Sequence, residues 1–373
     1  MNRIPVFSTA FDGNELRYVT DCIESGWISS EGPYVGRFER EFAAAHGKKH
    51  GIAVCNGTAA LEVAVEALRL GKGDEVIMPA FTIISCASAV IRAGATPVLV
   101  DCDARTWNMD VSQVERAITP RTRAIMAVHI YGLPVDLDPV RALAQKHGLY
   151  VIEDAAEAIG LKYKGRLCGG FSDISAFSFY ANKHVTTGEG GMLLTDDDQL
   201  AERCRSLRNL CFQPPRRFVH EEIGWNMRMC NLQAAVGVAQ LEKLDKTIAR
   251  KKEIGRAYTA LLADFPLVQV PVTATPEAEN VYWVYGVVLS DEVPFDATEA
   301  EARLAKFGID TRPFFWCMHE QPVFHRMGLF KNESYPISER IARRGFYLPT
   351  GLNLEPAQIE SIAEALKKVL TTL

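Results

Sequence analysis

The sequence predicts an α/β fold with a mostly parallel central sheet and a smaller C-terminal α+β domain. From about residue 49 to residue 195, short apolar runs rich in Val and Ile alternate with segments of helical periodicity. This alternation is typical of strands in a parallel sheet that helices cover. After Asn231 the pattern is helical for about thirty residues, and short strand and helix patterns follow. A chain of 373 residues is long enough for two domains, which we expect at residues 1–245 and 246–373.

The expected elements follow in chain order. Two helices precede the sheet, and the second carries Phe38 and Phe42 at helical spacing. These helices are expected at residues 15–24 and 33–45. The strands of the sheet are expected at residues 51–54, 75–78, 97–101, 124–130, 150–153, 174–179 and 191–194. In the C-terminal domain we expect strands at 281–289 and 310–315 and helices at 298–307 and 356–370.

Composition and charge exclude several classes of protein. Hydrophobic residues make up 48% of the chain and charged residues 23%, which is typical of globular proteins and excludes a disordered or collagen-like chain. The 41 Lys and Arg residues against 46 Asp and Glu residues give a net charge of −5. This balance offers no positive excess to attract a nucleic acid or an anionic membrane, so we expect neither partner.

Cysteine usage and the N-terminus indicate the compartment. The nine cysteines are odd in number and widely spaced, with no Cys-x-x-Cys pair. The first residues lack the apolar region of a signal peptide, and no apolar run approaches the ~18 residues that a membrane span requires. We therefore expect a cytoplasmic protein with reduced cysteines and no membrane partner.

Carboxylates come directly after the predicted strand at 150–153. In open α/β sheets, ligands bind beyond the carboxyl ends of the strands, which places Asp154 where a ligand-binding residue would lie. A helix-capping aspartate is equally common at such a turn. From its position alone, Asp154 fits both interpretations.

A single lysine, Lys183, follows the aromatic strand expected at 174–179 and precedes a glycine-rich segment. Most lysines lie on the surface. These neighbours instead indicate a lysine in a cleft, where loss of water lowers the pKa of the amine and leaves it nucleophilic. An amine that can form a Schiff base, with a carboxylate that can keep a pyridine nitrogen protonated, is what pyridoxal phosphate requires.

A phosphate site is expected at Gly57 and Thr58, where a strand leads into an alanine-rich helix. Glycine lets the backbone approach a ligand closely, and a helix N-terminus attracts an anion. Taken alone, the segment favours an ordinary Asn-Gly turn capped by Thr58, and the phosphate site gains its weight from Asp154 and Lys183 in the same chain. Dinucleotide binding is disfavoured, because Gly71 and Gly73 precede a strand and lack a third glycine.

Taken together, these motifs resemble those of the DegT/DnrJ/EryC1/StrS sugar aminotransferases, which have the aspartate-aminotransferase fold (fold type I). The resemblance covers nearly the whole chain. It implies a pyridoxal 5′-phosphate (PLP)-dependent transaminase. The segments that carry it lie at residues 27–33, 56–58, 128–132, 153–157, 183–191 and 224–229.

The resemblance implies a role for each cofactor residue. Lys183 is expected to form the Schiff base and carry the proton, and Asp154 to pair with the pyridine nitrogen. Asn226 is expected to reach the phosphate of the neighbouring subunit's cofactor, which implies an obligate homodimer with shared active sites. Glu157, near the phenolic oxygen, could also be a solvated carboxylate. The phosphate ligands are expected to be Gly57, Thr58 and Ser178, although Ser178 could be an ordinary strand hydroxyl.

Within the family, the motifs are most similar to those of perosamine synthases, which use glutamate to aminate C4 of GDP-4-keto-6-deoxy-mannose in O-antigen or lipopolysaccharide biosynthesis. Ile83 departs from the aromatic residue that these enzymes usually place against the cofactor. The segment from Asn209 to Cys211 replaces their Gly-Gln-Gly. An aminotransferase for a dTDP- or UDP-linked sugar, a PLP-dependent dehydratase and a non-catalytic regulator are the alternatives. The dehydratases of the family have histidine in place of Lys183, so transamination is favoured.

The expected substrate residues are Ser29, Arg216, Arg217 and His319. Ser29 and His319 lie in segments similar to the substrate side of the family. Arg216 and Arg217 follow two prolines, and arginine suits a diphosphate because it donates two parallel hydrogen bonds. A solvated loop is the ordinary explanation of such a pair. His129, His319 and His325 have no Cys, Asp or His partner at metal-ligand spacing, so we expect no metal site.

Overall fold

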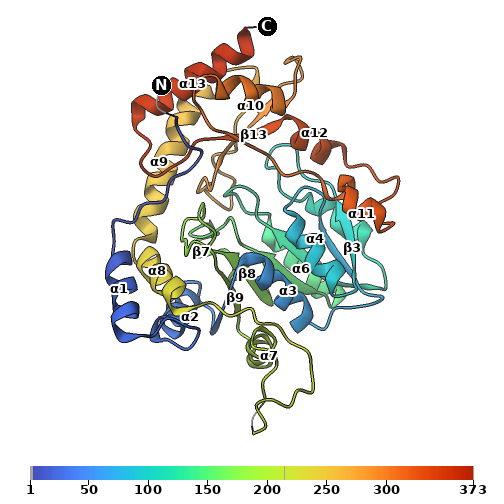
Figure 1. The fold of residues 1–373 in the computed structure, drawn as a ribbon. Helices are drawn as coiled ribbons and strands as arrows, with labels where there is room; N and C mark the ends of the chain where they lie inside the picture. Colours follow the sequence, from blue (N-terminus) through green and yellow to red (C-terminus); the bar gives the residue numbers. More distant parts are fainter. Residues whose placement is uncertain (1–2, 214, 373) are drawn as a thin grey trace.

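The computed structural model describes residues 3–213 and 215–372, and a seven-stranded sheet forms its centre (Figure 1). All seven expected strands form. β9 runs antiparallel to its neighbours β1 and β8, and the remaining pairs are parallel, so the sheet is mostly parallel as expected. In the order β1-β9-β8-β5-β4-β2-β3, the strands span His50–Val54, Gly191–Thr195, Ile174–Ser178, Tyr150–Asp154, Thr122–Val128, Glu75–Pro79 and Thr96–Val100.

Both faces of this sheet are buried, which explains why its strands appear in the sequence as continuous apolar runs. Val76 and Met78 of β2 pack into one hydrophobic cluster, and Ile77 between them packs into another on the opposite face. The helices between the strands are α3 (Gly57–Ala67), α4 (Ile84–Arg92), α5 (Val114–Ala117) and α6 (Leu137–His147), and α7 (Asp198–Arg208) follows β9, the last strand of this sheet along the chain. A short hairpin, β6 (Lys162–Tyr163) and β7 (Arg166–Leu167), follows β5.

The two N-terminal helices form where expected, as α1 (Glu15–Ser25) and α2 (Pro33–Ala45). Both pack against α8 (Asn231–Glu242), and α2 also packs against β1. Phe38 of α2 is fully buried, with its ring centroid 4.9 Å from that of Phe179. The N-terminal segment therefore packs against the chain just after β8, four residues before Lys183.

The C-terminal part has its own sheet and its own hydrophobic cluster. It begins with α9 (Leu244–Leu262), so the thirty-residue helical pattern is two helices. The predicted domain boundary after residue 245 falls in the first turn of α9 and stays a prediction. The antiparallel sheet has the order β10-β11-β13-β12, and in that order its strands span Val268–Gln269, Tyr285–Leu289, Gly345–Leu348 and Arg312–Pro313. The further helices of this part are α10 (Ala297–Ala305), α11 (Pro322–Arg326), α12 (Pro336–Arg344) and α13 (Pro356–Thr371).

Two expected strands of this part are shorter than predicted. The run 281–289 forms a strand only from Tyr285, because Tyr282 has a left-handed backbone with φ of 49°. The run 310–315 pairs only at Arg312 and Pro313, at the edge of the sheet, where a proline without an N–H group is tolerated.

All nine cysteines are free thiols. Within residues 3–213 and 215–372, no helix is long and apolar enough to cross a membrane.

Candidate active site

A cavity of about 600 Å³ lies beyond the carboxyl ends of β5 and β8, next to the start of α3. This is the position at which open α/β sheets bind ligands, and the volume suits a cofactor together with part of a substrate. Six of the seven residues expected at the cofactor line it: Gly57, Thr58, Asp154, Glu157, Ser178 and Lys183.

Lys183 reaches the cavity from the turn that follows β8, where its N–H donates to Tyr180 O at 2.9 Å. Its side chain is only 9% exposed, and Nζ lies 3.8 Å from Glu157 Oε1. Burial lowers the pKa of Lys183, and the charges of Glu157 and Asp154 partly offset that effect. The amine therefore lies in a cleft and not on the open surface.

Glu157 is buried in the same wall of the cavity. Its Oε2 accepts a hydrogen bond of 2.9 Å from the N–H of Tyr131. Burial raises the pKa of Glu157 to about 8, although the nearby charge of Lys183 acts in the opposite direction. The interpretation of Glu157 as a solvated carboxylate is therefore wrong.

Asp154 ends β5 and is followed by a turn, so the interpretation as a helix cap is wrong. Its Oδ1 accepts from the N–H of Ala156 at 3.1 Å, and its Oδ2 accepts from the thiol of Cys86 at 3.1 Å. Burial and the charge of Asp154 raise the pKa of Cys86 well above its usual range, which keeps the thiol protonated and able to donate. Thr82 Oγ1 lies 3.3 Å from Cys86 Sγ, which extends the hydrogen-bonded chain.

The start of α3 has the features of an anion site. Asn56, and not Thr58, caps the helix, because Asn56 Oδ1 accepts from Ala59 N at 2.8 Å. The N–H groups of Gly57 and Thr58 make no hydrogen bond to any other described residue. A Cβ at Gly57 would come within 2.7 Å of Ser178 Cβ, so the close approach of α3 to the end of β8 requires glycine. Unbonded N–H groups at a helix N-terminus suit a phosphate.

The C-terminal part supplies the remaining wall of the cavity through Trp283, Phe315 and Tyr347. No sequence pattern pointed to Trp283, whose ring centroid lies 3.7 Å from Lys183 Nζ. Ile83 also lines the cavity and is 38% exposed, so an aliphatic side chain stands at the position where the family pattern has an aromatic one.

Two of the predicted substrate residues line a second, separate cavity. Ser29 and Arg217 contribute to a space of about 540 Å³ that also contains Arg205, Arg208 and Arg228. Arg216 is exposed beside it, and Pro214 of the same loop lies outside the described residues. Asn226 lines neither cavity and pairs through its backbone with Asn209. Within one chain, these residues are not brought to the first cavity.

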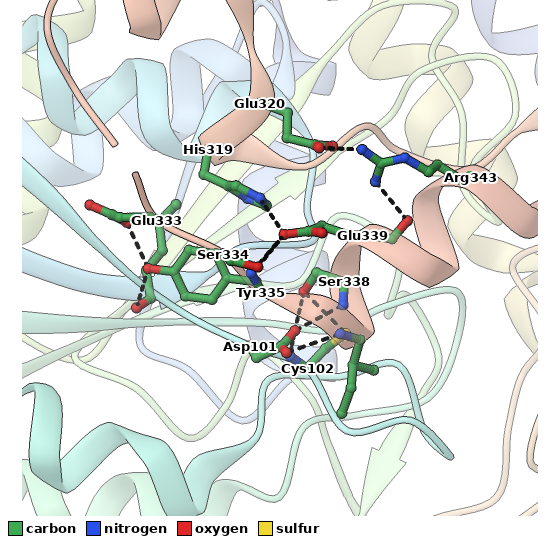
Figure 2. Close-up of polar contacts among 12 residues, drawn as sticks. Asp101, Cys102, His319, Glu320, Glu333, Ser334, Tyr335, Ser338, Glu339 and Arg343 are labelled. Carbon is green, nitrogen blue, oxygen red and sulfur yellow. Dashed lines mark hydrogen bonds and ion pairs between the residues drawn. The ribbon is translucent and has the colours of Figure 1, made fainter. Parts of the chain in front are cut away.

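His319 also lies away from the first cavity and is 3% exposed. Its Nε2 lies 3.0 Å from Glu339 Oε1, which also accepts from Tyr335 N. The Asp101 carboxylate after β3 accepts from the N–H and hydroxyl of Ser338, so this network joins the start of α12 to the large sheet (Figure 2). The arrangement supports a structural task for His319, and its predicted sugar contact stays a prediction.

Another histidine, His129, pairs with a carboxylate inside the large sheet. Its Nε2 lies 2.9 Å from Glu153 Oε1, and both side chains are fully buried. Its Nδ1 accepts from Val135 N at 3.3 Å, so the ring has a partner at each nitrogen. Spacing along the sequence did not reveal this pair, because its members lie 24 residues apart.

Comparison with known proteins agrees with this geometry. The model of the DegT/DnrJ/EryC1/StrS aminotransferase family matches residues 10–367. A GDP-perosamine synthase of Caulobacter vibrioides is 42% identical over 368 residues, which cover 99% of this chain and 98% of that protein. A GDP-perosamine synthase of Escherichia coli O157:H7 is 41% identical over 368 residues, with 99% of each chain covered.

Among solved structures, the X-ray structure of Streptomyces venezuelae DesV in complex with a ketimine intermediate is similar over 100% of both chains. The TM-score is 0.91 and the sequence identity 36%. The resemblance of the sequence motifs and the aspartate-aminotransferase-like α/β fold are thereby confirmed. The chain belongs to the DegT/DnrJ/EryC1/StrS aminotransferase family.

Proposed function

We propose that this aminotransferase uses PLP to move an amino group from glutamate to GDP-4-keto-6-deoxy-mannose, which gives GDP-perosamine. One observation carries the proposal: a single cavity contains a buried amine, the carboxylate of Asp154 and the unbonded N–H groups that begin α3. The choice of sugar rests on the relatives named GDP-perosamine synthase, which align over nearly their full length.

The described residues fit PLP at each of its polar groups. The N–H groups of Gly57 and Thr58 and the hydroxyl of Ser178 would hold its phosphate, since they converge where glycine leaves room beside α3. Asp154 would hold the proton of the ring nitrogen, and Lys183 would bind the aldehyde carbon. When bound, PLP supplies an electron sink for the bond that breaks at Cα of the amino donor.

Lys183 is the proposed proton carrier. Because burial lowers its pKa, the amine is available in its uncharged form to take the proton from Cα of glutamate. In the second half of the reaction it would deliver a proton to C4 of the sugar. Glu157, 3.8 Å away and with a pKa of about 8, can hold a proton beside the amine at neutral pH.

We further propose a homodimer with shared active sites, on the basis of charge. Among the described residues that line the first cavity, Lys183 is the only basic one, and the acids there are Glu62, Asp154, Glu157 and Glu189. Glutamate and a nucleotide diphosphate are both anions and need cationic donors. The arginines around the second cavity would supply them from a partner subunit, with Arg217 serving the diphosphate and not glutamate.

Exposed apolar side chains on α1 and just after it support such a partner. Leu16 is 80% exposed, Ile23 61% and Trp27 51% on and just after α1. Large apolar side chains gathered on one face mark contact surfaces in many soluble proteins. Cross-linking or light scattering of the purified protein tests the dimer, and a monomer with full activity would contradict shared active sites.

The function is tested by its two half-reactions. Glutamate alone should convert the bound cofactor to its amino form with release of 2-oxoglutarate, and the ketosugar should reverse that change. A panel of GDP-, dTDP- and UDP-linked 4-keto sugars then identifies the substrate, and we expect the GDP-linked sugar to react fastest. Faster reaction of a dTDP- or UDP-linked sugar would contradict the proposed substrate. Loss of water without transfer of an amine would instead identify a dehydratase.

A further inference from the structure

The indole ring of Trp283 covers the amine of Lys183. Nζ lies 3.7 Å from the centroid of the ring, and Trp283 is only 5% exposed. The negative face of an aromatic ring attracts an ammonium group within about 6 Å, and tryptophan does so most strongly where water is excluded. The contact therefore favours the protonated form of the Lys183 amine.

Local backbone geometry fixes this ring. Tyr282, just before it, has a left-handed backbone with φ of 49°, and its N–H donates to Asn280 Oδ1 at 2.7 Å. Val281 N donates to Gly132 O at 2.9 Å. A Cβ at Gly132, where φ is 95°, would come within 2.7 Å of Trp283 N. The segment before β11 thus departs from a strand to bring Trp283 against the end of the large sheet.

Hydrogen bonds from both parts of the chain hold Trp283 in this position. Its Nε1 donates to Asn182 O at 3.0 Å, the residue beside Lys183. Its own carbonyl accepts from Lys251 Nζ of α9 at 2.9 Å, and Lys251 also donates to Thr350 O at 3.0 Å. Such bonds at both ends of the residue limit rotation of the ring away from the amine.

The ring differs from the other groups that favour a charged amine. Asp154 and Glu157 attract the ammonium group but can also accept its proton, whereas an aromatic face stabilises the charge and leaves the proton free to move. Burial acts against all three groups by lowering the pKa of Lys183. The titratable groups around Lys183 are Asp154 at the end of β5, Glu157 after it, Tyr131 after β4, Tyr180 and His184 on either side of the lysine, Tyr347 of β13 and, behind His184, Lys251 of α9.

We propose that Trp283 is a catalytic residue that stabilises the free, protonated amine of Lys183 through a cation–π contact during the steps in which the lysine carries the proton. The role of Trp283 in the reaction rests on the proposed function. The contact itself is a property of the chain and is tested without turnover.

The first test measures the ionisation of Lys183 in the full-length protein freed of cofactor. Acetylation of Lys183 by acetic anhydride is followed against pH by mass spectrometry in the wild type, Trp283→Leu and Trp283→Phe. We expect the midpoint to fall by about one pH unit in Trp283→Leu and by less in Trp283→Phe. The exposed Trp316, whose ring faces the guanidinium of Arg343, gives the matched control Trp316→Leu, in which the Lys183 midpoint should stay at the wild-type value.

The direction of the shift separates two roles. If Trp283 only excludes water, the smaller leucine admits water, the charged amine is better solvated and the midpoint rises. A rise or an unchanged midpoint in Trp283→Leu therefore overturns the cation–π proposal.

A second test keeps the shape of the side chain. In protein grown with mono-, di- and trifluorinated tryptophan, each added fluorine weakens the negative electrostatic potential over the face of the indole ring. The pH midpoint of Lys183 acetylation should therefore fall stepwise with fluorination. In a Trp283→Phe background, the same fluorination of the other tryptophans should have no effect. Equal shifts in both backgrounds, or no shift in either, overturn the proposal. Failure of glutamate to donate its amine, by contrast, overturns the proposed function and leaves these midpoints unaffected.

Discussion

Lys183 Nζ and Glu157 Oε1 lie 3.8 Å apart in the wall of the cavity, on side chains that are 9% and 8% exposed. Burial has opposite effects on the two groups. It lowers the pKa of the lysine and raises the pKa of the glutamate to about 8, while the charge of each partner offsets part of the effect. Glu157 therefore gains and loses its proton near neutral pH, beside an amine whose pKa is lowered, where the proposed reaction needs a mobile proton.

Glu157→Gln should change how stability depends on pH. The folded pKa of Glu157, about 8, is above the ordinary value of 4.5. The folded protein therefore retains a proton that the unfolded chain releases, and this stabilisation is lost as pH rises from about 4.5 to 8. Relative to the variant, the wild type should lose on the order of 3 kcal/mol of stability between pH 5 and pH 8.

Urea unfolding of cofactor-free protein at both pH values measures this effect. The exposed Glu360 of α13 gives the matched control, Glu360→Gln, whose difference from the wild type should be the same at pH 5 and pH 8. Equal differences for Glu157→Gln as well would show that Glu157 does not titrate in this range.

Asp154→Asn should bind PLP and yet slow the glutamate half-reaction by a factor of about 100. A neutral amide cannot keep the ring nitrogen protonated in a site without water, and the loss of one such electrostatic contact costs about 3 kcal/mol. Stopped-flow absorbance after addition of glutamate measures the rate. A rate within twofold of the wild type would exclude the proposed role of Asp154.

Cys86 should act as a positioning residue for that carboxylate, because its thiol donates to Asp154 Oδ2 at 3.1 Å. Cys86→Ala removes the donor and should slow the glutamate half-reaction about fivefold, whereas Cys86→Ser retains a donor and should restore the rate. Thermal unfolding of both variants measures any loss of packing separately. If serine fails to restore the rate while both variants are equally stable, the hydrogen bond has no part in orienting Asp154.

Replacement of both Arg216 and Arg217 with alanine should raise KM for the sugar nucleotide about tenfold or more and leave the glutamate half-reaction unchanged. Glutamate has no diphosphate, so only the nucleotide loses its cationic donors. Steady-state kinetics with each substrate varied in turn measure the two effects. Equal weakening of both half-reactions would show that the loop of Arg216 and Arg217 has only a structural role.

Much of the large sheet could be predicted because strands buried on both faces need apolar side chains, and these appear in the sequence as short apolar runs. Ile77 and its neighbours pack on opposite faces, so the run from Val76 to Met78 in β2 had to be apolar throughout. The apolar runs also show where β5 and β8 end, which places Asp154 at the end of one strand and Lys183 shortly after the other. Both residues line the same cavity because these neighbouring strands end at the same edge of the sheet.

Contacts between distant segments could not be predicted in this way. Cys86 lies 68 residues before Asp154, and Trp283 lies 100 residues after Lys183, so no local pattern reports either pair. Left-handed Tyr282 shortens the expected strand, and it is this departure from regular structure that brings Trp283 into the site. His319 also resembled a residue facing a substrate, whereas its buried ring lies against Glu339, twenty residues away.

The most direct test of the account is to find where the cofactor attaches. Protein loaded with PLP is reduced with borohydride, digested and examined by mass spectrometry. The account predicts one modified peptide with the reduced cofactor on Lys183, and no such adduct in Lys183→Ala. An adduct on another lysine, or a protein that takes up no cofactor, would contradict it.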